Sequence, residues 1–134
     1  MSNAEHLLQH AMAAREHAYA PYSHFAVGAA VLSRDGRVFA GCNVENASYG
    51  LCNCAERTAL FSAIAAGCQP RDLVRLAVVG DTPEPVSPCG ACRQVMLELL
   101  AEDARIVLGT IDGTQRETTA QALMPDGFRL PGTP

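Results

Sequence analysis

The chain has 134 residues, 49% of them hydrophobic, which is enough for the core of one domain and leaves little for a second. We therefore expect residues 1–134 to form a single domain. The formal net charge is −4 and there is no lysine, which argues against a protein that follows a nucleic-acid backbone and favours a small uncharged substrate.

Neither membrane insertion nor export is predicted. The sequence has no apolar run near the roughly 20 residues that span a bilayer, and its beginning does not resemble a signal peptide. Six cysteines would suit a secreted disulfide scaffold, but without a signal peptide we expect reduced thiols or metal ligands. The cytoplasm is the expected location.

Apolar periodicity divides the chain into alternating helices and strands. Pro21 predicts a loop at 19–25, and Gly36 predicts a hairpin turn at 34–36. The small apolar residues between these two loops predict a strand covered by helices on both faces. The alternation predicts an α/β fold of three layers, α/β/α. In chain order the predicted elements are a helix over 3–18, strands over 26–32 and 37–45, a helix over 54–66, a strand over 73–80, a helix from Cys89 to about 102, a strand over 105–111 and a short helix over 119–123.

Three cysteines and a glutamate form the most informative pattern. Cys54, Cys89 and Cys92 can supply three thiolates, and a catalytic zinc keeps three protein ligands and an open fourth position. Cys54 and Cys89 fall at predicted helix N-termini, where free N–H groups and the helix dipole stabilise a thiolate. Glu56, in the first turn after Cys54, can reach this site and transfer protons there without binding the metal.

Arg57 directly follows this glutamate. Three thiolates bring more negative charge than a zinc dication carries, so we expect Arg57 to donate hydrogen bonds to the sulfurs. The alternative for this arginine is a surface ion pair.

Two other interpretations of the cysteines stay open. Cys52 could act as a fourth thiolate, which would close the site, make the zinc structural and leave Glu56 without a role. Cys89 and Cys92 could form a redox pair, because Cys-Gly-Ala-Cys before a helix has thioredoxin-like spacing, although the rest of the pattern is then unexplained. The cysteines that we interpret as small buried residues without a ligand role are Cys42, Cys52 and Cys68.

Asn43 and Glu45 stand at the end of the second predicted strand. Because side chains alternate along a strand, both are expected on the same face. A carboxylate beside an amide can bind a diol, since the carboxylate accepts hydroxyl protons and the amide both donates and accepts. A polar strand end that faces water explains the pair equally well.

Several motifs occur in order between Tyr19 and about Phe128: AYAPYSHFAVGAAV, the Asp-Gly turn, NVENASYG, CAERTA, PCGACRQV and LMPDGF. They resemble the motifs of the cytidine deaminases, specifically the short single-domain type that is usually a homotetramer. The Cys-x-Glu and Pro-Cys-x-x-Cys pair is the established signature of zinc-dependent nucleobase deaminases. One local difference is Cys52-Asn53 before Cys-Ala-Glu, where several members of the family have no extra thiol.

The resemblance implies a cytidine deaminase-like sandwich with a central mixed β-sheet. It also implies that Cys54, Cys89 and Cys92 hold one zinc per chain and that Glu56 is the proton shuttle. The implied substrate contacts are Phe25 against the pyrimidine, Asn43 and Glu45 on the ribose hydroxyls, the backbone around Ala55 on the base carbonyl, and Tyr49 and Phe128 reaching in from neighbouring subunits.

The implied activity is the zinc-dependent hydrolytic deamination of cytidine and 2′-deoxycytidine to the corresponding uridines with release of ammonia, a reaction of pyrimidine salvage. The implied assembly is a homotetramer with shared active sites, and no nucleic-acid or membrane partner is expected. Two alternatives remain. One is a blasticidin S-type deaminase, which shares the zinc motif and size but lacks a match to NVENASYG and to Arg57; the other is a non-catalytic structural zinc module.

Overall fold

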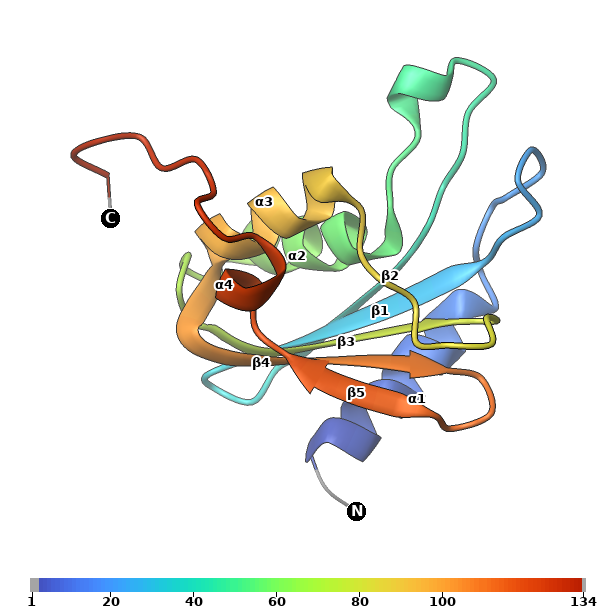
Figure 1. The fold of residues 1–134 in the computed structure, drawn as a ribbon, viewed down its shortest axis with the longest axis horizontal. Coiled ribbons are helices and arrows are strands. Elements are labelled where there is room, and N and C mark those ends of the chain that lie inside the picture. The colour runs from blue at the N-terminus through green and yellow to red at the C-terminus, as the bar shows by residue number, and fades with distance from the viewer. Residues whose placement is uncertain (1–2, 134) are drawn as a thin grey trace.

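A five-stranded mixed sheet runs through the molecule, with α1 on one face and α2, α3 and α4 on the other (Figure 1). The computed structural model describes residues 3–133. The strand order is β2-β1-β3-β4-β5; β3 and β4 are parallel and the other neighbouring pairs are antiparallel. The predicted three-layer sandwich with a central mixed sheet is thus confirmed. In chain order the elements are α1 (Asn3–Arg15), β1 (Val27–Ser33), β2 (Val38–Cys42), a 3-10 turn (Tyr49–Leu51), α2 (Ala55–Ala65), β3 (Leu73–Gly80), α3 (Gly90–Leu99), β4 (Leu100–Thr110), β5 (Gln115–Thr118) and α4 (Ala120–Leu123).

The core lies on both faces of the sheet, as the small apolar residues of β1 predicted. Successive side chains of a strand point to opposite faces. Ala29 and Val31 belong to the larger apolar cluster under α2 and α3, whereas Ala30 belongs to the smaller cluster under α1. All three side chains are fully buried. No helix within residues 3–133 is long and apolar enough to cross a membrane.

Four boundaries differ from the sequence prediction by three residues or more, and one of them is the start of β4, which lies at Leu100 rather than at 105. The first helix ends at Arg15 rather than at 18, because the chain turns there so that Tyr19 can pair with Val44. The third helix ends at Leu99 rather than at about 102, since Leu100 already pairs with Leu73 of β3. The second strand ends at Cys42 rather than at 45. The prediction also missed β5, a polar edge strand whose Gln-Arg-Glu-Thr sequence carries no apolar alternation.

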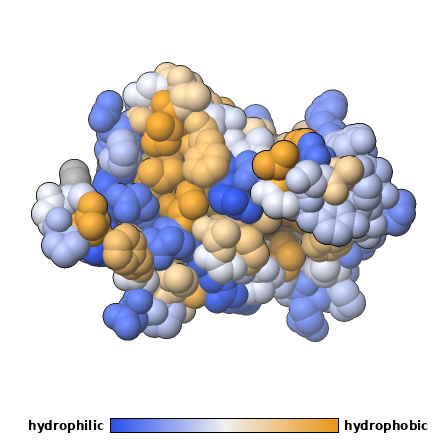
Figure 2. All heavy atoms as spheres, turned by 90° about the horizontal axis from the view of Figure 1, so that it is seen from above, coloured by the Kyte–Doolittle hydropathy of each residue, from blue (hydrophilic) through white to orange (hydrophobic). Residues whose placement is uncertain are grey.

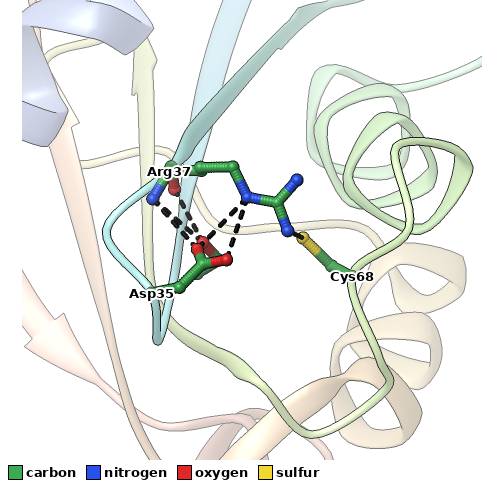
Figure 3. A network of polar contacts seen from close by, with 4 residues as sticks. Asp35, Arg37 and Cys68 are labelled. Atoms are coloured by element: carbon green, nitrogen blue, oxygen red, sulfur yellow. Dashed lines mark hydrogen bonds and ion pairs between the residues drawn. The ribbon is translucent and has the colours of Figure 1, made fainter.

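A polar network at the β1–β2 turn connects Asp35, Arg37 and Cys68 (Figure 3). Arg37 Nε donates to Asp35 Oδ2 at 3.0 Å, and Arg37 Nη2 donates to the sulfur of Cys68 at 3.4 Å. Hydrogen bonds from the Ser33 hydroxyl and from Arg37 lower the pKa of Asp35 to about 2. Cys68 follows the C-terminus of α2, so the network joins the β1–β2 turn to that helix.

Helix α2 lies directly against β2 at Gly41. A Cβ atom at this position would come within 2.5 Å of the backbone nitrogen of Ala59 and 2.8 Å of the carbonyl oxygen of Ala55. These are backbone atoms, so they cannot give way without a shift of the helix. The glycine therefore sets the distance between the sheet and the first turn of α2.

We predict that Gly41→Ala lowers the free energy of unfolding by about 1–3 kcal/mol, because the added methyl group overpacks the contact between helix and strand. Thermal unfolding at matched protein and zinc concentrations measures the effect. Gly50→Ala is the control: nothing lies within 4 Å of its Cβ position, and we expect a change below about 0.5 kcal/mol. Equal stability of the two variants would contradict the close approach.

Candidate metal centre

Three thiols gather where the N-termini of α2 and α3 meet. Cys54 is the N-cap residue of α2, and Cys89 is the N-cap residue of α3. Cys92 lies in the first turn of α3, and its backbone N–H donates to the sulfur of Cys89 at 3.5 Å. The Sγ atoms of all three lie within 4.8 Å of one another, and those of Cys54 and Cys89 are 3.7 Å apart. The predicted convergence of the two motifs is confirmed.

This donor set fits a zinc ion. Sulfurs at the usual Zn–S distance of about 2.3 Å from a tetrahedral zinc lie roughly 3.8 Å apart, close to the separation of Cys54 and Cys89. Thiolates are soft ligands that bind zinc well and bind hard cations such as magnesium and calcium poorly. Cys92 is fully buried, whereas Cys54 and Cys89 line a pocket, so the cluster has one side open to that pocket. Three ligands and an open side are the arrangement of a catalytic site rather than a structural one.

Cys54 carries the negative charge of the cluster most readily. Hydrogen bonds, first with Cys92 and then with Arg57 and Cys89, together lower the pKa of Cys54 to about 5 against the opposing effect of burial. The same hydrogen bond and burial raise the pKa of Cys92. The lowered pKa of Cys54 thus favours its thiolate form, which is the form that binds a metal.

Glu56 lies beside the thiols and is the buried acid of the site. Its side chain is 5% exposed, and burial raises its pKa to about 7. The negative charge of Cys54 raises this pKa as well, whereas Arg57 lowers it. A carboxyl group with a pKa near neutrality can both accept and release a proton at the working pH of most enzymes.

Arg57 makes the contact that the sequence predicted. Its Nη2 donates to the sulfur of Cys54 at 3.5 Å, and its Nε is buried without a hydrogen-bond partner. Hydrogen bonds to Cys54 and Cys92 raise the pKa of the guanidinium. The four ion pairs found within residues 3–133 do not include Arg57, so the surface ion pair is not its role in this structure.

A pocket of about 290 Å³ opens beside the cluster. It lies at the N-terminal end of α2, and the loops before β1 and after β2 form its opposite wall. Four lining residues were not predicted from the sequence: Ser23, Val27, Val86 and Ser87. No motif of charged or metal-binding residues marks them, and only the fold brings their loops to the site. The predicted site residues that line the pocket are Phe25, Asn43, Glu45, Cys54, Ala55, Glu56 and Cys89.

Asn43 and Glu45 face the pocket together, although β2 ends before them. Asn43 Oδ1 accepts from the N–H of Val27 at 2.8 Å, and its Nδ2 donates to the carbonyl of Phe25 at 2.7 Å. Glu45 Oε2 accepts from the hydroxyl of Ser23 at 2.5 Å. This hydrogen bond is the main cause of the lowered pKa of Glu45. Both side chains are therefore held in place, and the carboxylate stays ionised.

Tyr49 and Phe128 do not line this pocket. Tyr49 is 73% exposed, and its ring meets that of Tyr22 edge to face at a centroid distance of 5.9 Å. Phe128 is 68% exposed and lies on the tail that follows α4. The prediction that these two residues serve other subunits stays a prediction.

Comparison with known proteins identifies the family. Residues 1–110 match the family model described as the cytidine and deoxycytidylate deaminase zinc-binding region. The chain belongs to the cytidine and deoxycytidylate deaminase family. A cytidine deaminase from Halalkalibacterium halodurans is 57% identical over 122 residues, which is 91% of each chain. One from Sporosarcina psychrophila is 48% identical and covers 94% of this chain and 91% of its own.

Solved structures of this family have the same fold. The crystal structure of a cytidine deaminase from Burkholderia pseudomallei is 59% identical, with a TM-score of 0.92 over 96% of this chain and 100% of that one. The cytidine deaminase from Mycobacterium tuberculosis is 41% identical, with a TM-score of 0.81 over 97% of this chain and 100% of that one. The family match and the thiol cluster together establish zinc as the cofactor.

The two alternative interpretations of the cysteines gain no support. Cys52 is not part of the metal-binding cluster; its sulfur instead accepts from the backbone N–H of Asn46 at 3.3 Å. All six cysteines are free thiols, so Cys89 and Cys92 do not form a disulfide here. Cys68 is buried as predicted, whereas Cys42 and Cys52 are half-buried.

We predict that Cys92→Ser loses the bound zinc and that Cys52→Ser keeps one zinc per chain, because only the first removes a sulfur from the cluster. Elemental mass spectrometry of the two purified variants measures their zinc content per chain. Loss of zinc from Cys52→Ser would instead indicate a closed site of four sulfurs.

We predict that Arg57→Ala keeps its zinc but loses about 10–100-fold in activity, since hydrogen bonds to metal ligands tune the charge on the sulfurs. Steady-state kinetics together with zinc content measure the effect. Arg34→Ala is the matched control, because Arg34 makes only an exposed ion pair with Asp72. Unchanged kinetics of Arg57→Ala would show that its contact with Cys54 does not serve the reaction.

Proposed function

We propose that this chain hydrolyses cytidine and 2′-deoxycytidine to uridine and 2′-deoxyuridine and releases ammonia, as a step of pyrimidine salvage. The observation that carries the proposal is a single pocket with a buried acid and an open thiol cluster at one end and an amide and a carboxylate at the other. The relatives named above are cytidine deaminases, which supports the same reaction.

Residues Cys54, Cys89 and Cys92 would hold the zinc. When bound, zinc supplies Lewis-acid chemistry that makes water a nucleophile near neutral pH. The three thiolates reduce this Lewis acidity, so we assign to Arg57 and to the N-termini of α2 and α3 the task of withdrawing charge from the sulfurs.

Glu56 would manage the protons of the reaction. Its carboxylate takes one proton from the attacking water and delivers it to N3 of the ring, while the new bond forms at C4. It then passes the second proton to the exocyclic amine, the C4–N bond breaks, and ammonia leaves. Both protons of the water are thereby used, and Glu56 returns to its starting state. Its pKa of about 7 suits both roles.

The other pocket residues would hold the nucleoside in place for this reaction. Phe25 lies at the pocket wall, where its ring can pack against the pyrimidine. The backbone at Ala55, the first residue of α2, can donate to the base carbonyl, because N–H groups in the first turn of a helix have no partner within the helix. Asn43 and Glu45 are fixed by the hydrogen bonds described above and would bind the ribose hydroxyls.

We also propose that residues 1–134 form one catalytic domain that assembles as a homotetramer in the cytoplasm. Two observations support assembly. Apolar surface gathers over the helical face of α2 and α3, where Phe61 is 47% exposed (Figure 2). Tyr49 and Phe128 are large exposed rings outside their own chain's pocket, which is expected of residues that complete a neighbouring site.

The proposal is tested by following the ultraviolet absorbance of cytidine incubated with zinc-loaded protein. We predict conversion to uridine by the wild type and a loss of several orders of magnitude in Glu56→Gln, which keeps fold and zinc but cannot transfer protons. Glu98→Gln, an exposed change on α3, is the control with unaltered rate.

Near-wild-type turnover of zinc-loaded Glu56→Gln would contradict the proposed role of Glu56 in proton transfer. Absence of conversion by wild-type protein with one zinc per chain would favour a blasticidin S-type substrate, to be tested next in the same assay. Failure of both substrates would favour a structural zinc.

A further inference from the structure

The tail after α4 is fastened to α3 by the side chain of Gln94. The amide of Gln94 donates from Nε2 to the carbonyl oxygen of Phe128 at 2.8 Å, and its Oε1 accepts from the N–H of Phe128 at 3.0 Å. One side chain thus satisfies both backbone groups of one residue. Gln94 stands only two positions after Cys92, so the tail is tied to the part of α3 that carries the thiols.

The backbone of the tail is shaped for this contact. A Cβ at Gly127 would lie 2.3 Å from Cδ2 of Leu97 and 3.3 Å from Oε1 of Gln94, so the tail lies close against the side chains of α3 here. Asp126 has a φ of 58°, in the left-handed region that non-glycine residues seldom adopt. The close approach at Gly127 and the left-handed conformation of Asp126 together give the tail a defined path along α3.

A second anchor lies at the start of the tail. Arg93, the neighbour of Gln94, donates from Nη1 to the carbonyl of Leu123 at 2.8 Å and from Nε to the carbonyl of Pro88 at 2.8 Å. Pro88 precedes Cys89 in the metal-binding loop. The loop, the end of α4 and the tail are therefore all held from the first turns of α3.

These contacts leave the ring of Phe128 free. The backbone of this residue is fully hydrogen-bonded by Gln94, while its side chain is 68% exposed and contributes nothing to its own pocket. Ordering a tail costs conformational entropy, so a fixed backbone that presents an exposed aromatic ring suits a residue that acts outside its own chain.

We propose that Gln94 is a positioning residue that sets where Phe128 meets the nucleoside in the active site of a neighbouring copy of the chain. The proposal rests on the assignment, made under the proposed function, that Phe128 completes another subunit's site. Gln94 itself touches no substrate and acts only through the backbone of Phe128. Arg93 holds the metal-binding loop and Gln94 holds the tail. The position of the tail relative to that loop is then the same in every subunit.

A double-mutant cycle of Gln94→Ala and Phe128→Ala tests the inference. Each single change should raise KM for cytidine about tenfold with a smaller change in kcat, as expected for the loss of one well-placed contact. The double variant should match Phe128→Ala alone, because Gln94 has no effect once the ring is absent. Gln121→Ala, an exposed change on α4, is the matched control with unaltered KM.

Hydrogen exchange supplies a readout that does not depend on activity. The amide of Phe128 should be protected in the wild type and exchange faster in Gln94→Ala. Gln94→Glu should keep this protection, since a carboxylate still accepts the amide hydrogen, but lose the bond to the carbonyl of Phe128.

Three results would overturn the inference. One is additive effects of the two changes on KM, and another is unchanged amide exchange in Gln94→Ala. The third is a normal KM in Phe128→Ala while Glu56→Gln is inactive, which refutes the role of Phe128 but leaves the deaminase function intact. Failure of the proposed deaminase function would give a different result, because the wild type would then show no turnover of cytidine.

Discussion

The meeting of two helix N-termini at one end of the sheet is the constraint on which the site depends. Cys54 caps α2 and Cys89 caps α3, so each thiol lies beside free backbone N–H groups and the positive end of a helix dipole. The sulfurs of Cys54 and Cys89 lie 3.7 Å apart, so both helix ends act on the same small group of donor atoms. The metal site is in this sense a property of helix placement.

Helix placement in turn depends on close packing and on polar anchors away from the site. Gly41 lets α2 approach β2 backbone to backbone, and Arg37 ties the segment after α2 to the β1–β2 turn. Helix α3 is held by Arg93, which bonds the loop before it and the end of α4. The positions of the sulfurs therefore depend on contacts that lie away from the metal site.

The two carboxyl groups of the pocket, Glu56 and Glu45, have pKa values shifted in opposite directions by their surroundings. Glu56 is almost fully buried, and its pKa rises to about 7, which suits an acid that takes and returns protons. Glu45 accepts hydrogen bonds from Ser23 and from the backbone of Tyr22, and its pKa falls. It therefore stays ionised, which suits its proposed contact with the ribose hydroxyls. Two carboxylates in one pocket thus receive different roles from their surroundings.

The sequence by itself determined the chemistry of this protein. The residue types and spacing of Cys54, Cys89 and Cys92, with Glu56 two positions after Cys54, were sufficient to predict a zinc donor set and a proton carrier, because ligand type and helix start signals are local. The alternation of predicted helices and strands also sufficed for the layers, and the run of small apolar residues sufficed for the buried strand β1. Only the tertiary structure decided where α1 and α3 end, that β5 forms the polar edge of the sheet, and that Ser23, Val86 and Ser87 line the pocket. These depend on pairing and packing between segments distant in the chain, which leave no periodic signal in the residues themselves. The hydrogen bonds between Gln94 and Phe128 join residues 34 positions apart, and they too could not be predicted from the sequence.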